Sequence, residues 1–288
     1  MNKWKEIITH STFRYIDHST ETTFENKPYT AMTSFAIDDA LALSVSDELS
    51  PPTIRLWVHD QTIVLGIPDA RLPYIETGVK LLANRGYHTI VRNSGGLAVA
   101  LDNGVLNISL VLPGVKHISI HDCYEAMFSF VKYMLRDLTN DIQAYEIVGS
   151  YCPGDYDLSI NGVKFAGISQ RRIRDGAAIQ IYLDVGGDSK GRAQLVRDFY
   201  DVSLRGEKTK FVYPTVVPET LGSLSALLGK KLTVEDMKSR VYSTLAELTN
   251  EIISPTFSKQ ELNTFQKRFQ QMEKRNEKIA KLQNKKGL

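Results

Sequence analysis

A cysteine and a lysine twelve positions apart are the strongest candidates for chemistry in this chain. Cys152 precedes a proline and a glycine, a pair that indicates a turn at the surface. Lys164 stands just after an Asn-Gly pair, which is typical of a two-residue hairpin. A thiol with an amine as its proton partner is a nucleophile for acyl transfer, and it carries the acyl group as a thioester. The two residues therefore predict acyl-transfer chemistry.

Both residues also have ordinary structural explanations. An unpaired cysteine is more often a small buried hydrophobe than a nucleophile, and a lysine after a hairpin turn is usually a solvated edge residue. Geometry adds a condition, because in a straight hairpin Lys164 pairs with Ser159, and Cys152 would lie roughly 23 Å further along. The two side chains can meet only if residues 149–156 curl back over the hairpin. We predict a mobile loop there that closes when an acyl group binds.

A second candidate feature is the turn Arg92-Asn-Ser94-Gly95-Gly96, which follows a predicted strand. Its residue types fit a plain hairpin turn as well as they fit a functional loop. In the functional interpretation, backbone N–H groups freed by the glycines hold a carbonyl or phosphate oxygen beside Arg92. The turn lacks the Gly-x-x-x-x-Gly-Lys spacing of a phosphate loop, so it does not indicate a nucleotide. Further along, Gly167 predicts a close approach by a ligand or another backbone.

Composition and cysteine usage narrow the class of protein. The 288 residues are 42% hydrophobic and 24% charged, and the sequence shows neither a signal-peptide pattern nor a membrane-spanning run. Cys123 and Cys152 are too few for a disulfide framework, and no second Cys or His stands at metal-ligand spacing from either. We expect a cytoplasmic protein that uses no metal and no cofactor. Cys123 lies in an amphipathic pattern and is expected to pack in the core.

Apolar and β-branched runs broken by Gly, Asn and Pro predict a sheet built largely from neighbouring strands. Helical spacing predicts a helix over residues 73–85 and another that begins near Ser119 and ends at about residue 137. Beyond residue 187 the pattern is mainly helical. These elements predict an α+β fold. The predicted strands are residues 54–59, 62–66, 88–92, 97–101, 105–112, 156–160, 163–169 and 177–185.

The chain ends in a basic amphipathic helix. Residues 267–288 hold eight Lys or Arg against two Glu. We predict a main domain over residues 1–250 and an amphipathic basic helix over residues 251–288. Because no aromatic residues interleave with the basic run after Phe269, we expect an ordinary solvated face and no nucleic-acid site. The apolar face of this helix begins with Leu262, Phe265, Phe269 and Met272.

Three stretches resemble the lipoate ligase, biotin ligase and octanoyltransferase superfamily, within residues 51–249. They are Arg92-Asn-Ser-Gly-Gly-Leu-Ala-Val, Leu106-Asn-Ile-Ser and Gly162-Val-Lys-Phe-Ala-Gly-Ile-Ser-Gln. Residues 149–159, Gly-Ser-Tyr-Cys-Pro-Gly-Asp-Tyr-Asp-Leu-Ser, are similar to one branch in particular. That branch moves octanoyl from the glycine cleavage H protein to lipoyl domains of oxo-acid dehydrogenase E2 subunits.

The resemblance implies a mixed, largely antiparallel sheet flanked by helices, with a helical C-terminal part. It implies that Cys152 carries the acyl thioester and that Lys164 tunes it. Octanoylated H protein is the implied donor and lipoyl domains are the implied acceptor, with no cofactor. Asn93 and Leu97 replace a second arginine and a third glycine that are common in the superfamily, which argues against adenylate binding. The residues implied at the acyl pocket or oxyanion site are Arg92, Ser94, Gly95, Gly96 and Gly167.

Three alternatives stay open at this point. One is an octanoyltransferase that takes its acyl group from acyl carrier protein, and another is an ATP-dependent lipoate ligase. The third is a non-catalytic module that binds lipoyl domains and uses the basic helix for docking, because lipoyl carriers are commonly acidic. The basic residues that would serve such docking are Lys267, Arg268, Lys274 and Arg275.

Overall fold

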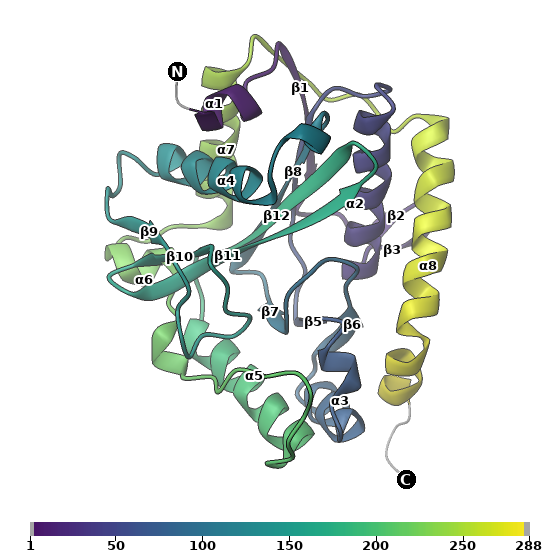
Figure 1. Ribbon diagram of the computed structural model, residues 1–288, viewed down its shortest axis with the longest axis vertical. Helices are drawn as coiled ribbons and strands as arrows, with labels where there is room; N and C mark the ends of the chain where they lie inside the picture. Colours follow the sequence, from purple (N-terminus) through teal and green to yellow (C-terminus); the bar gives the residue numbers. More distant parts are fainter. Residues whose placement is uncertain (1–2, 285–288) are drawn as a thin grey trace.

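The computed structural model describes residues 3–284, and an eight-stranded sheet runs through the middle of the molecule (Figure 1). Its strand order is β13-β1-β4-β8-β12-β11-β10-β9. Strand β1 pairs in parallel with both β13 and β4, and the other neighbours are antiparallel. The sheet is therefore mixed and largely antiparallel, which confirms the predicted fold class. The strands are β1 (Thr12–His18), β4 (Thr53–Trp57), β8 (Val105–Leu112), β9 (Ile142–Ala144), β10 (Asp157–Ile160), β11 (Val163–Ile173), β12 (Gly176–Asp184) and β13 (Glu251–Ile253).

A small second sheet lies beside the large one and has the order β6-β5-β7. Its strands are β5 (Thr62–Leu65), β6 (His88–Val91) and β7 (Val99–Leu101). Because β6 and β7 both pair with β5, the glycine turn between them joins the two outer strands of this sheet. The plain-hairpin interpretation of this turn is therefore wrong. A further short pair is formed by β2 (Thr23–Phe24) and β3 (Lys27–Pro28).

Helices cover both faces of the large sheet, with one hydrophobic cluster on each side. On one face α2 packs on the sheet and α8 lies against α2, while α1, α4 and α7 lie on the other face (Figure 1). Helices α3 and α5 pack against each other near the small sheet. Among residues 3–284, none of the helices is both long and apolar enough to cross a membrane. The helices are α1 (Lys3–Ile8), α2 (Ala31–Ser46), α3 (Ile75–Asn84), α4 (Ile120–Met134), α5 (Ser189–Leu204), α6 (Leu224–Leu228), α7 (Val234–Leu248) and α8 (Lys259–Asn284), with 3₁₀ turns at Asp69–Arg71, Val115–His117 and Pro218–Thr220.

Local sequence signals explain the elements nearest the candidate site. Asn161 and Gly162 have φ angles of 52° and 76°, the left-handed pair that a tight hairpin turn requires, and they join β10 to β11. Lys164 faces Ser159 across this hairpin, as predicted. Helix α4 begins after Ser119, whose side chain accepts a hydrogen bond from the backbone N–H of Asp122. It ends at Met134, three residues before the predicted end.

The C-terminal helix α8 is part of the same core as the rest of the chain. Its Glu261 forms a buried ion pair with Arg14 of β1, with 2.6 Å between the charged atoms. Its Asn276 and Gln283 donate and accept hydrogen bonds with the backbones of Val91 and Thr89 in β6. The division of the chain at residue 250 stays a prediction, while these contacts tie the helix beyond it to the strand that leads into Arg92.

Candidate active site

The turn that carries Cys152 folds back over the β10–β11 hairpin, as the proposed pairing requires. Cys152 itself has a φ of 47°, a left-handed conformation that is uncommon for any residue with a side chain. Gly149, at the start of the turn, has a φ of 88°. The backbone carbonyls of Tyr151 and Cys152 accept hydrogen bonds from the Lys164 ammonium group, at 2.9 and 3.0 Å. These bonds hold the turn against the sheet.

Lys164 is fully buried, which corrects the picture of a solvated edge lysine. Its Nζ lies 2.8 Å from a carboxylate oxygen of Asp157 and 3.2 Å from the hydroxyl of Ser150. Burial raises the pKa of the Asp157 carboxyl group, and the neighbouring Lys164 charge opposes that rise. The ammonium group of Lys164 thus contacts the backbone carbonyl oxygen of Cys152. The Cys152 sulfur has other hydrogen-bond partners.

The sulfur of Cys152 faces the glycine turn. It accepts a hydrogen bond from the backbone N–H of Leu97 at 3.1 Å and another from the guanidinium group of Arg92 at 3.3 Å. Gly96 has a φ of 101°, and a Cβ atom added there would lie 2.8 Å from the sulfur and would overlap the Arg92 side chain. The glycine therefore lets the backbone approach the thiol.

The other predicted residues of the glycine turn differ in their surroundings. Gly95 lines the pocket next to the sulfur, and a Cβ atom added to it would meet nothing within 4 Å. Ser94 is buried, and its hydroxyl has no hydrogen-bond partner among residues 3–284. Sequence alone did not distinguish these positions from Gly96, because the difference arises from the neighbouring loop. The structure brings together Arg92, Gly95, Gly96 and Cys152 around one cavity.

That cavity has a volume of about 240 Å³ and runs from an open rim to a buried end. Gly167 lies in one wall, where it faces Tyr182 across the sheet. An added Cβ on Gly167 would lie only 2.9 Å from the Tyr182 ring, so the predicted close approach is made by a neighbouring ring. The rim is lined by His121, Tyr124, Asp155 and Tyr156, and the buried end by Phe35, Trp57, Val64, Val99 and Leu101.

Two supporting carboxylates were not identified from the sequence. Asp157 accepts hydrogen bonds from the N–H of Ile147 and from the hydroxyl of Ser150 in addition to its ion pair. Asp69 accepts a 2.9 Å hydrogen bond from Tyr200, whose hydroxyl also accepts the N–H of Ala98 just behind the glycine turn. Burial raises the pKa of Asp69 to about 6. The sequence could have indicated Asp157, because it lies on the strand that pairs with the strand of Lys164. It could not have indicated Asp69, because its partner Tyr200 is far away in the sequence.

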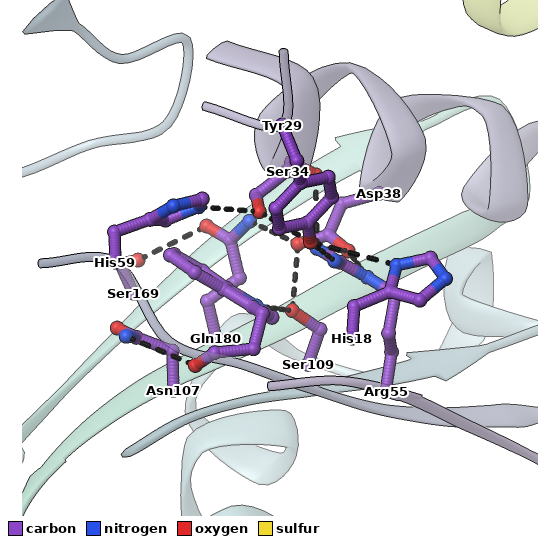
Figure 2. A network of polar contacts seen from close by, with 11 residues as sticks. His18, Tyr29, Ser34, Asp38, Arg55, His59, Asn107, Ser109, Ser169 and Gln180 are labelled. Carbon is purple, nitrogen blue, oxygen red and sulfur yellow. Dashed lines mark hydrogen bonds and ion pairs between the residues drawn. The ribbon is translucent and has the colours of Figure 1, made fainter. Parts of the chain in front are cut away.

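Beneath the buried end lies a network of polar side chains (Figure 2). Arg55 and Asp38 form an ion pair that is completely shielded from solvent, with 2.7 Å between the charged atoms. Gln180 and Ser109 each donate a 2.6 Å hydrogen bond to the second oxygen of Asp38. At the far side of the network, burial lowers the pKa of His59 to about 3. The network thus joins α2 to three strands of the large sheet.

Among residues 3–284, no group of three or more His, Cys, Asp or Glu side chains is arranged so that it could hold a metal ion. Cys123 and Cys152 are both free thiols. Cys123 is buried in α4, as predicted, and its sulfur accepts a hydrogen bond from Arg172.

Comparison with known proteins adds an independent line of evidence. Residues 30–246 match the family model of the lipoyl protein ligase A/B catalytic domain. An octanoyl-[GcvH]:protein N-octanoyltransferase of Oceanobacillus iheyensis is 62% identical over 96% of this chain and 99% of its own length. A lipoyl-[GcvH]:protein N-lipoyltransferase of Listeria monocytogenes is 43% identical, over 97% of this chain and 99% of its own.

Solved structures match in fold. A putative lipoate protein ligase of T. acidophilum with bound lipoic acid has a TM-score of 0.66 and 17% identity, over 90% of this chain and 95% of its own. Lipoate-protein ligase A bound with ATP has a TM-score of 0.65, also at 17% identity, over 91% of this chain and 94% of its own. At this level of identity the match shows only that the folds are alike.

Proposed function

Because the chain belongs to the family of the lipoyl protein ligase A/B catalytic domain, we propose that it is an octanoyl amidotransferase that works through a thioester on Cys152. The donor is the octanoyl-lysine of the glycine cleavage H protein. The observation that carries the proposal is the sulfur of Cys152 at the wall of an apolar cavity, hydrogen-bonded to Arg92 and to the N–H of Leu97. Relatives of nearly equal length that are named octanoyl-[GcvH]:protein N-octanoyltransferases support the choice of acyl group and donor.

The first half-reaction exchanges an amide for a thioester. The Cys152 thiolate attacks the carbonyl carbon of the octanoyl-lysine, and a carbon–sulfur bond forms. The carbon–nitrogen bond then breaks, and the departing amine must take up a proton. Arg92 stabilises the attacking thiolate, and the N–H of Leu97 is the nearest backbone donor for negative charge that develops beside the sulfur.

The second half-reaction regenerates the thiol. A neutral lysine amine of the acceptor attacks the thioester carbon, loses its proton and leaves a new amide, while the thiolate of Cys152 is released. The net change replaces one lysine amide by another, so the overall free energy is close to zero and no ATP is needed. The site therefore has only to lower the activation barrier of the exchange, and it does not have to couple the reaction to ATP hydrolysis.

Lys164 is the proposed proton carrier between the two amines. Its Nζ lies 3.0 Å from the carbonyl oxygen of Cys152 and is also held by Asp157. A movement of the turn over residues 149–156 would exchange that carbonyl for the departing nitrogen, which fits the mobile loop we expected. Until then the same hydrogen bonds keep Cys152 in its left-handed conformation.

The acceptor and the compartment complete the proposal. We assign lipoyl domains of oxo-acid dehydrogenase E2 subunits as acceptors, because they too present a lysine for octanoylation. The reaction is placed in the cytoplasm, where thiols stay reduced and a thiolate nucleophile keeps its reactivity.

Mass spectrometry of the intact protein tests the mechanism. After incubation with octanoylated H protein and no acceptor, the wild type should gain one octanoyl group on Cys152, in a bond that hydroxylamine cleaves. Cys152→Ala should gain none and should transfer none to a lipoyl domain. Cys123→Ala is the matched control and should behave as the wild type, since that thiol packs in α4. Octanoyl transfer by Cys152→Ala would overturn the thioester mechanism.

A panel of donors separates the remaining alternatives. Octanoylated H protein should support labelling of a lipoyl domain, whereas octanoyl-acyl carrier protein, or free octanoate with ATP, should not. Labelling from octanoate and ATP alone would identify a ligase. Labelling from acyl carrier protein would place the chain one step earlier in the transfer of the same acyl group.

A further inference from the structure

The buried end of the acyl cavity is formed by side chains that solvent does not reach. Phe35, Trp57, Val64, Val99 and Leu101 line it, and each is at most 4% exposed. The opposite rim contains exposed or half-buried residues such as Asp155 and Tyr156. An acyl group on Cys152 can avoid water only by pointing its chain toward the closed end, so that end limits the chain.

Trp57 is fixed in this wall by a directional contact. Its indole N–H donates a 2.9 Å hydrogen bond to the hydroxyl of Ser109, and that hydroxyl donates a 2.6 Å bond to Asp38. The ring of Phe35 stands nearly edge-on to Trp57, with 5.7 Å between ring centres. Moving the indole aside would break the bond to Ser109 and leave a buried N–H without a partner.

The same carboxylate holds a second part of the wall. Gln180 lines the cavity from β12, and its amide nitrogen donates a 2.6 Å hydrogen bond to Asp38. Figure 2 shows how Ser109, Gln180 and Arg55 converge on Asp38 from three strands. Two separate segments of the wall therefore have their positions set by one buried group.

The support behind this apolar wall is polar and includes a buried ion pair. A buried ion pair such as Arg55–Asp38 is costly to desolvate, and well-packed apolar residues are often equally stable in its place. An apolar wall, however, repacks around added methylene groups when total volume allows. Hydrogen bonds to a fixed carboxylate oppose that repacking, because each shift leaves polar groups unpaired.

We propose that the Asp38 network is an acyl-length gauge that stops the chain at Trp57 and Phe35. Octanoyl fits in front of the wall, and longer saturated chains are rejected because they must displace the anchored indole. This inference rests on the proposed function, since it assumes an acyl chain attached to Cys152. Specificity of about tenfold or more for each added methylene is the scale that a shaped apolar pocket provides.

Ser109→Ala tests the gauge without enlarging the cavity directly, because it removes only the hydroxyl that anchors Trp57. H protein acylated with octanoyl, decanoyl or dodecanoyl groups is the probe, and the readout is the initial rate of thioester formation on Cys152 by intact mass. We expect the ratio of the dodecanoyl rate to the octanoyl rate to rise at least about tenfold. Ser203→Ala is the matched control, since Ser203 is equally buried and its hydroxyl has no partner among the described residues.

A second variant covers the case in which Ser109→Ala fails to fold. Phe35→Leu shortens the wall itself and should also favour the longer chains, while thermal unfolding verifies that each variant is folded. An unchanged chain-length ratio in folded Ser109→Ala would overturn the gauge; if that variant does not fold, an unchanged ratio in folded Phe35→Leu would overturn it. Absence of any octanoyl thioester on wild-type Cys152 would instead overturn the proposed function, so the two failures are distinct.

Discussion

At the scale of single residues, the thiol and the lysine have different surroundings, although they belong to one site. The Cys152 sulfur faces Arg92 and the N–H of Leu97, while Lys164 is engaged with Asp157 and with the carbonyls of the turn. Sequence placed Cys152 and Lys164 in one candidate site from residue type and turn chemistry, and their catalytic roles stay a prediction. It did not predict their orientation, because the direction of each side chain depends on how the loop closes over the hairpin.

Loss of the Lys164 charge should destabilise the fold as well as the reaction. Lys164→Met leaves the buried Asp157 carboxylate without its ion-pair partner, and we expect the free energy of unfolding to fall by about 3 kcal/mol. Adding Asp157→Asn removes the unpaired charge and should recover part of this loss. Urea unfolding of the single and double variants measures both effects.

The control for that experiment is Lys190→Met, which changes an exposed lysine on α5. Its unfolding free energy should stay within about 0.5 kcal/mol of the wild type. If Lys164→Met is equally harmless to stability, the ion pair does not hold the turn, and loss of activity in the variant would then report chemistry alone.

At the scale of elements, α2 is the clearest gap between sequence and structure. Its residues are nearly all buried, between the large sheet and α8, so the segment shows no amphipathic stripe of the kind that identified α4. Helix α8 shows the opposite case. Its predicted apolar face, which runs from Leu262 to Met272, continues with Asn276 and Ile279. The asparagine interrupts the hydrophobic pattern because it binds a strand edge.

Asn276 makes a testable contribution to the stability of β6. Asn276→Ala removes the amide that pairs with both backbone groups of Val91, which leaves two buried polar groups without partners. We expect the free energy of unfolding to fall by about 2 kcal/mol and the amide hydrogen of Val91 to exchange faster. Gln270→Ala, an exposed position on the same helix, is the control and should have little effect.

Unchanged protection of the Val91 amide in Asn276→Ala would contradict this account. It would mean that the remaining contacts of α8 suffice to cover the strand edge. Hydrogen exchange followed by mass spectrometry resolves the segment over residues 88–92 and thus reports the local effect separately from global stability.

At the scale of the whole molecule, sequence predicted most strands near the site but not how they are distributed between two sheets. Strands 62–66, 88–92 and 97–101 were expected among their chain neighbours in one sheet, whereas they form the small sheet. Pairing across long separations, such as β1 with β13, leaves no local pattern. The suggested docking role of Lys267, Arg268, Lys274 and Arg275 stays a prediction.

Acid should destabilise the folded molecule through its buried histidines. Burial lowers the pKa of His18 and His59 to about 3, below the usual value of about 6.5. Between these values the unfolded chain binds more protons than the folded one, so stability falls as the pH falls. Each such histidine accounts for a loss of about 2 kcal/mol between pH 7 and pH 5.

The variant His59→Gln separates the contribution of His59 to acid destabilisation from the contributions of groups that act in the opposite direction. Asp69, whose pKa is raised to about 6, shifts stability in the other direction over part of the same range, so the variant is compared with the wild type at each pH. The advantage of the wild type over the variant should shrink by about 2 kcal/mol from pH 7 to pH 5. Parallel stability curves for the two proteins would show that folding does not lower the pKa of His59.

The hydrogen bonds from Asn276 and Gln283 to the backbone of β6 have a consequence for the synthesis of the chain. During synthesis the ribosome releases every residue of the proposed site before it releases α8. The growing chain therefore carries Arg92 next to an unpaired strand edge, a surface that invites pairing with other chains. A premature stop codon near residue 250 would spare each proposed catalytic residue and still yield a product prone to aggregate.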